Sequence, residues 1–151
     1  MTQSIQVDAD LLRREVSSKY KEVALNPGGD FHFHTGRSLA AKLGYDQPIV
    51  DALPDAAVES FSGIGNPFLL RTLDKGENVV DCGAGAGFDC FVAASQVGDT
   101  GRVVGIDMTA EMLTKSRATA ASMGQDNVEF REGYLEAIPV EDGWADVVIS
   151  N

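Results

Sequence analysis

A short stretch near the middle of the chain combines an acid with three alternating glycines, directly after an apolar run. It reads VVDCGAGAGFD and contains Asp81, Gly83, Gly85 and Gly87. Because the glycines have no side chains, a ligand can lie against the backbone, near the positive end of the helix that we expect to begin around Phe88. The pattern is typical of a turn that binds a nucleotide at the carboxyl end of a strand.

A second acid, Asp107, lies near the end of the next apolar run, 20 residues after Gly87. A carboxylate at the tip of the second strand can accept hydrogen bonds from both hydroxyls of a ribose. The turn and the acid together predict an adenosine-type ligand. The alternative is a glycine turn in an unrelated α/β fold. A nicotinamide-dependent oxidoreductase is disfavoured, because the dinucleotide pattern G-x-G-x-x-G would need a glycine at Phe88.

Hydrophobic periodicity and turn residues predict the elements that must position these groups. In the front portion we expect helices over 10–25, 37–45 and 49–53, a loop over 55–68 and a helical segment over 66–73. Strands and helices then alternate, with strands over 77–82, 101–108, 127–134 and 145–151 and helices over 88–98 and 109–124. This alternation predicts an α/β fold with a parallel sheet and right-handed crossovers.

The predicted elements suggest two parts, a helical lid and acceptor wall over 1–60 and a Rossmann-like ligand-binding domain over 61–151. The last strand ends at Asn151, where a two-sided sheet would not normally stop. A parallel strand needs a neighbouring strand and a covering helix. We therefore expect either a longer domain, truncated here after its fourth strand, or a homo-oligomer in which another chain covers that strand.

Composition restricts the partners. The chain has 12 basic and 23 acidic residues, a net charge of −11, which disfavours nucleic acid and membrane surfaces. It has no apolar run of the ~18 residues that would span a bilayer, and its first residues do not form a secretory signal. Cys82 and Cys90 are expected to be buried free thiols, which favours a cytoplasmic location.

The same motifs resemble a known family. VVDCGAGAG and VVGIDMTAEMLTKSR are similar to motifs I and II of class I S-adenosylmethionine-dependent methyltransferases. GAGFDCFVAASQVGDTGRVVGIDMTAEML and NVEFREGYLEAIPVEDGWADVVISN resemble more narrowly the arsenite-methyltransferase-like branch. The resemblance is close over 58–151. It implies a Rossmann-like methyltransferase sheet, S-adenosylmethionine as cofactor and a small-molecule methyl acceptor.

The resemblance also implies a role for individual residues in cofactor binding. The turn would approach the methionine part of the cofactor, Asp107 would hold the ribose and Met108 would pack on the adenine. Residues implied to complete the site are Asp81, Gly83, Ala84, Gly85 and Gly87 in the turn, Leu135 and Glu136 beside the adenine, and Ser150 and Asn151 at the methionine end.

Two positions around the implied site need separate interpretation. Tyr20 falls where related enzymes have an aromatic residue that covers the cofactor, and an aromatic face can stabilise a sulfonium. A tyrosine of the hydrophobic core is the alternative. Gly133 is followed by Tyr134, where many methyltransferases have an acid that contacts the adenine amino group, so backbone groups or Glu136 would make that contact.

The acceptor does not follow from the resemblance. Arsenite methyltransferases hold trivalent arsenic through cysteine thiolates, one of them just ahead of a GNP turn. Here SGIGNPF has Ile64 at that position and the front portion has no cysteine, which argues for a different small molecule. We assign no catalytic residue, because a nucleophile with a free lone pair needs no proton transfer when the cofactor carries the reactivity.

A histidine pair raises the question of a metal. His32 and His34 in FHFHTG would share one face of an extended segment. Without a third ligand at a recognisable spacing we predict no metal site, and interpret both as loop histidines beside a buried Phe31 and Phe33. A role of the pair in shaping the acceptor pocket is the alternative. The competing hypothesis for the whole chain is a truncated, non-catalytic module that binds S-adenosylmethionine without turnover.

Overall fold

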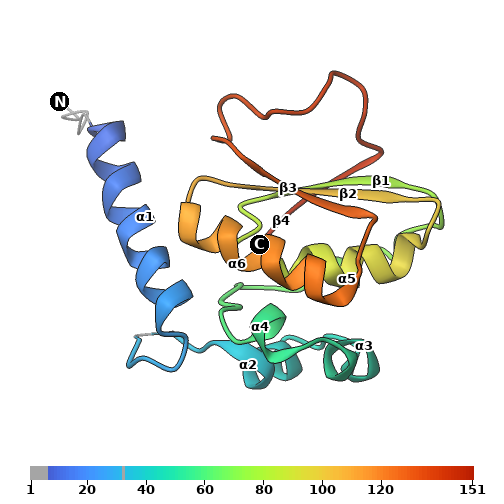
Figure 1. The fold of residues 1–151 in the computed structure, drawn as a ribbon, viewed down its shortest axis with the longest axis horizontal. Coiled ribbons are helices and arrows are strands. Elements are labelled where there is room, and N and C mark those ends of the chain that lie inside the picture. Colours follow the sequence, from blue (N-terminus) through green and yellow to red (C-terminus); the bar gives the residue numbers. More distant parts are fainter. Residues whose placement is uncertain (1–6, 32) are drawn as a thin grey trace, which may run out of the picture.

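A four-stranded parallel sheet forms the centre of the computed structural model, which describes residues 7–31 and 33–151 (Figure 1). Its order is β3-β2-β1-β4. The strands are β1 (Asn78–Cys82), β2 (Arg102–Asp107), β3 (Val128–Glu132) and β4 (Val147–Ser150). The chain therefore adds β2 and then β3 on one side of β1 and places β4 on the other side of β1. Open α/β sheets bind ligands at such a switch point, beyond the carboxyl ends of the strands.

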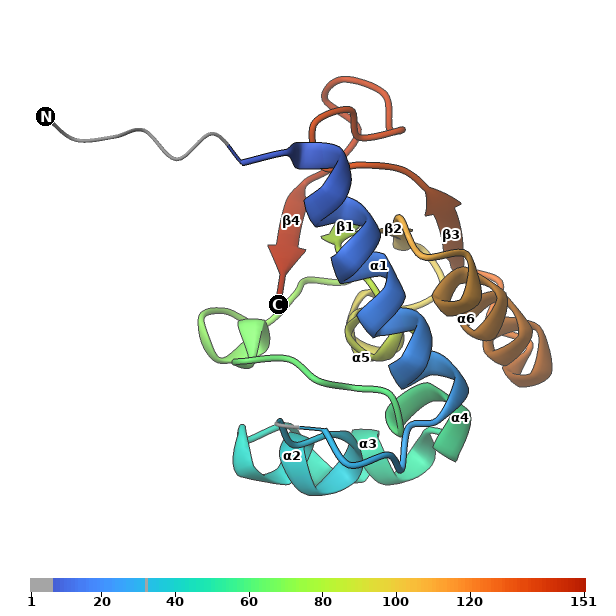
Figure 2. The same cartoon turned by 90° about the vertical axis from the view of Figure 1, so that its left-hand side faces the viewer.

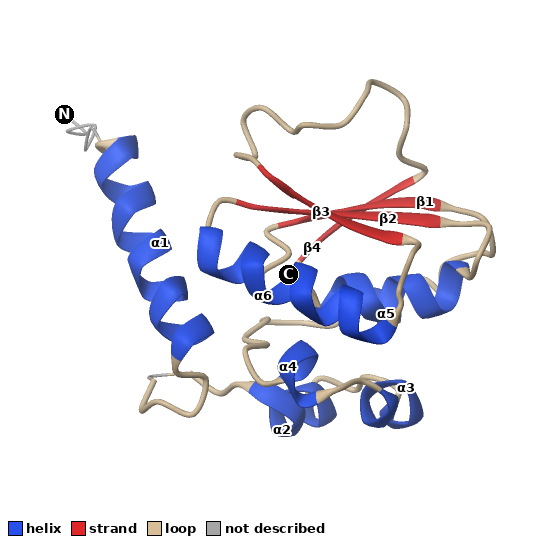
Figure 3. Ribbon diagram, viewed as in Figure 1, coloured by secondary structure: helices blue, strands red, loops and turns tan. Residues whose placement is uncertain are grey.

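Both long helices of the predicted α/β unit lie on one face of the sheet (Figure 3). They are α5 (Phe88–Val97) and α6 (Ala110–Met123). Gly98 ends α5 with a φ of 67°, as expected for a glycine C-cap. The opposite face is covered by the loop 133–146, which contributes Trp144 to the packing. The α/β fold with a parallel sheet is confirmed.

Alternation along the strands explains how both faces are filled. Val79 and Val103 belong to the cluster that includes α5, whereas Val80 and Val104 pack toward the loop 133–146. Residues two apart on a strand share a face, so apolar side chains at consecutive positions bury the central strands on both sides. This is why β1 and β2 read as short continuous apolar runs in the sequence.

The front portion is helical, and it differs from the prediction in two places. Its elements are α1 (Ala9–Leu25), α2 (Gly36–Lys42), α3 (Gln47–Ala52), α4 (Asp55–Val58) and the 3₁₀ turn η1 (Pro67–Leu69). The expected loop over 55–68 contains α4, whose Ala57 and Val58 are fully buried. The helical segment expected over 66–73 is only η1. Leu70 is 90% exposed there, so a longer helix would have no surface on which to bury an apolar face.

Helix α1 lies beyond the carboxyl ends of the strands and beside α6 (Figure 2). Asp8 caps its start by accepting hydrogen bonds from the backbone N–H groups of Asp10 and Leu11 at 3.0 Å. Near its other end, Val23 packs with Ala86 and Met112. The last turns of α1 are therefore held by the body of the molecule. The functional division at residue 60 stays a prediction.

The remaining predictions on the front portion and the thiols have mixed outcomes. Cys82 and Cys90 are buried and free, as expected. Phe33 was expected to be buried, and this is wrong, because its ring is exposed and stacks on Phe31. His32 lies outside the described residues. None of the described helices is long and apolar enough to cross a membrane.

Gly87 provides a test of the packing between α5 and the sheet. Its φ is +94°, and a Cβ at this position would lie 2.6 Å from Cζ of Phe130. We expect Gly87→Ala to lower the free energy of unfolding by about 2–5 kcal/mol, from backbone strain of ~1–2 kcal/mol and overpacking of ~1–3 kcal/mol. Urea denaturation measures this.

The matched control is Gly124→Ala, because Gly124 also has a positive φ, of +61°, but an added Cβ would meet no atom within 4 Å. The control variant should lose only the backbone contribution, about 1–2 kcal/mol. Equal losses in the two variants would contradict the packing role of Gly87.

Candidate functional site

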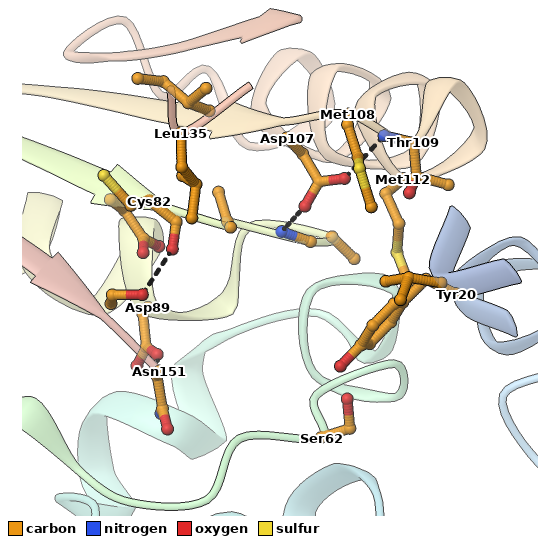
Figure 4. Close-up of a pocket in the computed structure, with 18 of the residues that line it drawn as sticks. Tyr20, Ser62, Cys82, Asp89, Asp107, Met108, Thr109, Met112, Leu135 and Asn151 are labelled. Carbon is orange, nitrogen blue, oxygen red and sulfur yellow. Dashed lines mark hydrogen bonds between the residues drawn. The ribbon is translucent and has the colours of Figure 1, made fainter. Parts of the chain in front are cut away.

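A cavity of about 420 Å³ opens at the carboxyl ends of β1 and β2, between α1 and the body of the molecule (Figure 4). Its size lies within the range of ~300–1,000 Å³ that is typical of small-molecule sites. The lining comes from α1, residues 60–63, the glycine turn, the start of α6, residues 133–136 and the end of β4. The cavity therefore lies at the switch point of the sheet.

The glycine turn forms an open part of the cavity wall. Gly83 and Gly85 have φ values of +78° and +56°, and a Cβ added to either would meet no atom within 4 Å. The positive φ values already favour glycine at both positions, and the missing side chains also leave the backbone open to a ligand. Gly87 differs, because it does not line the cavity and instead admits the ring of Phe130. The sequence analysis did not distinguish Gly87 from Gly83 and Gly85.

Asp107 is fixed at the edge of the cavity by backbone groups. Its two carboxylate oxygens accept hydrogen bonds from the N–H groups of Gly85 and Thr109, each at 2.8 Å. Thr109 stands at the N-cap of α6, but its side chain makes no capping hydrogen bond. A carboxylate has about four acceptor sites, so Asp107 keeps acceptor capacity toward the cavity.

Asp81 is a buried acid whose surroundings disfavour ionisation. It is 2% exposed, and the thiol of Cys90 donates a hydrogen bond to it at 3.3 Å. Burial raises the pKa of Asp81 to about 8, and the negative charge of Asp89 adds to this, with a smaller effect from Asp107. The thiol hydrogen bond acts in the opposite direction. Within the described ranges no basic side chain forms an ion pair with Asp81.

A second buried acid, Asp89, joins two distant parts of the chain. Tyr45 Oη donates a hydrogen bond to its Oδ1 at 2.6 Å, and Asn151 Nδ2 donates one to its Oδ2 at 3.0 Å. Burial raises the pKa of Asp89, while these two hydrogen bonds lower it. Sequence reasoning did not single out Asp89 or Tyr45. The only signal was the position of Asp89 in the first turn after the glycines.

The lid side of the cavity comes from α1. Leu12, Val16 and Tyr20 line it from one face of this helix. Arg13 Nη2 donates to Glu136 Oε1 at 2.6 Å, across the mouth of the cavity, and its guanidinium lies 4.9 Å from the centre of the Tyr134 ring. The hydrogen bond and charge of Arg13 lower the pKa of Glu136.

Most of the predicted site residues lie around one cavity. Those that line it are Asp81, Gly83, Ala84, Gly85, Asp107, Met108, Leu135, Glu136, Asn151 and Tyr20, together with Ser150. Gly87 is the exception. His34 is exposed in the loop before α2 and does not line the cavity. No group of three or more residues suited to hold a metal ion occurs in the part of the chain that the structure describes.

A parallel sheet with this order, a glycine turn after β1 and an acid at the end of β2 define the class I fold of S-adenosylmethionine-dependent methyltransferases. Residues 73–151 match a family model described as a methyltransferase domain, and the chain belongs to this family. This family match and the relatives described next confirm the predicted resemblance to class I methyltransferases and to their arsenite-methyltransferase-like branch.

Two similar proteins support the resemblance to the arsenite-methyltransferase-like branch. The chain is 45% identical over 124 residues to an arsenite methyltransferase of Halobacterium salinarum, covering 82% of this chain and 32% of that protein. An arsenite methyltransferase of Aquipseudomonas alcaligenes is 45% identical over 96 residues, covering 59% of this chain and 27% of that protein. The chain thus spans about a third or less of the length of these curated relatives.

Solved structures agree on the fold. An arsenic(III) S-adenosylmethionine methyltransferase from Chlamydomonas reinhardtii superposes with a TM-score of 0.63 and 36% identity, over 70% of this chain and 38% of that one. An S-adenosylmethionine-dependent methyltransferase from Aquifex aeolicus gives a TM-score of 0.50 and 28% identity, over 56% of this chain and 51% of that one.

The raised pKa of Asp81 predicts a pH dependence of stability. The folded chain holds this proton up to about pH 8, whereas the unfolded chain releases it near 3.8, so folding becomes less favourable as pH rises through that window. Asp81→Asn removes this loss. As the pH rises from about 5 to about 8, the free energy of unfolding of the variant should increase by at least ~1.4 kcal/mol relative to that of the natural chain, since each pKa unit corresponds to that energy.

Urea denaturation at several pH values measures the difference. Asp142→Asn, which changes the net charge equally on an exposed loop, is the control. A constant difference between the Asp81→Asn chain and the natural chain across this window would contradict the prediction.

Proposed function

We propose that the cavity binds S-adenosylmethionine and that the protein is a methyltransferase acting on a small-molecule acceptor. One observation carries this proposal: the open backbone at Gly83 and Gly85 lies directly beside a carboxylate, Asp107, that is fixed by Gly85 itself. This arrangement fits an adenosyl ligand, because the backbone needs room for the ligand and the ribose needs an acceptor. Membership of the methyltransferase domain family supports it.

The residues around the cavity would divide the cofactor between them. Asp107 would accept hydrogen bonds from the ribose, with Met108, Leu135 and Glu136 around the adenine. Ala84 and the two open glycines would lie along the methionine part, and its ammonium beside Asp81 would favour the ionised form of this buried acid. When bound, the cofactor supplies a methyl group on a sulfonium, which a nucleophile attacks in line.

The role of the chain is then to hold the reactants and exclude water. Helix α1 covers the cavity, and Tyr20 presents an aromatic face to it (Figure 4). An aromatic face stabilises a cation by about 0.5–2 kcal/mol. Holding nucleophile and methyl group in line supplies much of the rate in reactions of this kind.

No side chain is needed to remove a proton from the acceptor. Asp89 lies beside Asn151 in the cavity wall, where a base could act, but both of its oxygens already accept hydrogen bonds. Burial raises the pKa of the Cys82 and Cys90 thiols, so neither is a ready base or thiolate. We therefore propose an acceptor whose nucleophilic atom has a free lone pair at neutral pH.

Arsenite captured by cysteine thiolates is not the acceptor that we propose. Ile64, which stands where the branch has a thiol, carries a 93% exposed side chain. The two cysteines of this chain are both buried, and only Cys82 touches the cavity. Within residues 1–151, a single protonated thiol at the cavity does not form the thiolate set that trivalent arsenic requires. The name arsenite methyltransferase thus remains that of the relatives.

We further propose that a second copy of the chain covers the open edge of β4. Val148 on this strand is 60% exposed, and β4 pairs with β1 on one side. A homo-oligomer would cover the other edge. Light scattering coupled to size-exclusion chromatography, over a range of protein concentrations, tests this through the mass in solution.

The cofactor site is tested by calorimetry. We expect S-adenosylmethionine to bind the natural chain and Asp107→Asn to weaken binding about tenfold or more, because hydrogen bonds to a charged acceptor contribute ~1.5–3 kcal/mol. Asp142→Asn should bind like the natural chain. Absence of binding heat in the natural chain, or equal affinity of the Asp107→Asn chain, would reject the site. A methyl-transfer assay with a panel of small acceptors separates an enzyme from a non-catalytic module.

The glycine turn gives an independent test. Gly83→Ala adds a methyl group where the protein leaves space, so the fold loses only about 1–2 kcal/mol from backbone strain. The methyl group would occupy the space of the ligand, and we expect S-adenosylmethionine to bind at least about tenfold more weakly. Gly124→Ala, with similar backbone strain far from the cavity, should keep its affinity. If both variants bind equally well, the ligand does not lie on the turn.

A further inference from the structure

The wall of the cavity that faces Asp107 has no regular secondary structure. Ser62 and Gly63 belong to it, and Figure 4 shows Ser62 across the cavity from Asp107. Neither a helix nor a strand satisfies the backbone of residues 62–65, so other groups must fix its position. On the proposed function, this wall is the side on which the acceptor would lie.

Asn151 provides most of that support. Its Oδ1 accepts hydrogen bonds from the backbone N–H groups of Ile64 and Gly65, both at 2.9 Å. Its Nδ2 donates to the carbonyl of Gly65 at 2.8 Å. The segment also lies directly on this amide, because a Cβ at Gly63 would come within 2.4 Å of Asn151 Nδ2. The wall therefore depends on the side chain of Asn151 and on the way its amide faces.

Asp89 and the carbonyl of Gly65 both accept hydrogen bonds from the NH₂ group of that amide and so favour the way it faces. An ionised carboxylate only accepts hydrogen bonds, so it attracts the NH₂ group of Asn151 and repels its carbonyl oxygen. With Nδ2 held at 3.0 Å from Asp89, Oδ1 points to the two backbone N–H groups of the wall. A reversed amide would present its NH₂ group to the N–H groups of Ile64 and Gly65, and both hydrogen bonds would be lost.

Tyr45 completes the arrangement from the front portion. Its hydroxyl donates to Asp89 at 2.6 Å and receives a hydrogen bond from Asn151 Nδ2 at 3.0 Å. Its ring packs against Phe61, Phe68 and Phe88. Burial raises the pKa of Tyr45, and the negative charge of Asp89 adds to this, so the hydroxyl remains a donor.

We propose that Asp89 is a positioning residue, which fixes the acceptor-side wall of the cavity through the amide of Asn151 and the hydroxyl of Tyr45. The inference rests on the proposed function for the meaning of that wall. It assigns Asp89 no proton transfer, since both oxygens accept from these two partners. The cofactor side, held by Asp107 and Gly85, uses a separate set of hydrogen bonds.

Amide hydrogen exchange in the ligand-free chain, followed by NMR, tests the inference. Asp89→Asn keeps the size of the side chain and removes its charge. We expect exchange at the Ile64 and Gly65 amides to become about fivefold faster or more, because the hydrogen bonds of both amides to Asn151 Oδ1 would form less often. The side-chain NH₂ signals of Asn151 should also shift. Exchange in β2 should change less than about twofold.

Two further variants make the test specific. Tyr45→Phe keeps the ring and removes one of the two donors, so it should accelerate exchange at the same two amides to a smaller extent. Asp146→Asn is the matched control, since this carboxylate accepts a backbone hydrogen bond from Asn78 at the far end of β1. It should leave the two amides unchanged. If the Asp89→Asn chain does not fold, Tyr45→Phe alone decides the outcome.

The proposal is overturned if exchange at Ile64 and Gly65 does not respond to Asp89→Asn and Tyr45→Phe. A uniform acceleration along the whole chain would also overturn it, because that would indicate a general loss of stability. S-adenosylhomocysteine serves as a separate probe of the cofactor side and should bind the Tyr45→Phe and natural chains within about threefold, because Tyr45 does not line the cavity. Failure of this probe to bind the natural chain would reject the proposed function and leave the exchange result intact.

Discussion

The hydrogen bond from the backbone N–H of Gly85 to the carboxylate of Asp107 joins the two motifs that define the site. It requires β1 and β2 to be adjacent and in register, with Asp81 opposite Gly105, so that the turn after β1 reaches the end of β2. It also requires the left-handed backbone of Gly85, which turns the N–H group toward the acid. The acid is thus oriented before any ligand binds, and little ordering is needed on binding.

The site concentrates negative charge in a way that a stable core alone would not favour. Asp81, Asp89 and Asp107 all line the cavity, and Arg13 is the only basic residue among the described lining residues. Arg13 is already paired with Glu136. Burying carboxylates without cations opposes folding, as the raised pKa of Asp81 indicates. A cationic ligand would relieve this repulsion, so the destabilised arrangement is consistent with a site for a sulfonium.

The sequence predicted the parts that depend on local patterns. Strands and long helices followed from hydrophobic periodicity, and the open glycines and Asp107 followed from their spacing. The prediction failed where contacts between distant residues decide the structure. Helix α4 has four residues, too few for a periodic signal, and it is stabilised by the burial of Ala57 and Val58. The hydrogen bond between Tyr45 and Asp89 joins residues 44 positions apart, which no local pattern reveals.

The two sides of the cavity therefore differ in origin, because one is formed by residues close together in the sequence and the other by residues far apart. The floor and Asp107 come from one strand-turn-helix-strand unit, and a change there disturbs both the backbone conformation and the packing of α5. The opposite wall comes from residues 62–65, held by side chains that arrive from α5, from the end of β4 and from the segment after α2. Its exposed residue, Ile64, can be exchanged without altering any of these hydrogen bonds, because its contact with Asn151 is made by the backbone. On the proposed function, the chain would keep one floor for the cofactor while the wall on the acceptor side varies, and a relative of arsenite methyltransferases could then lack a thiol at this position.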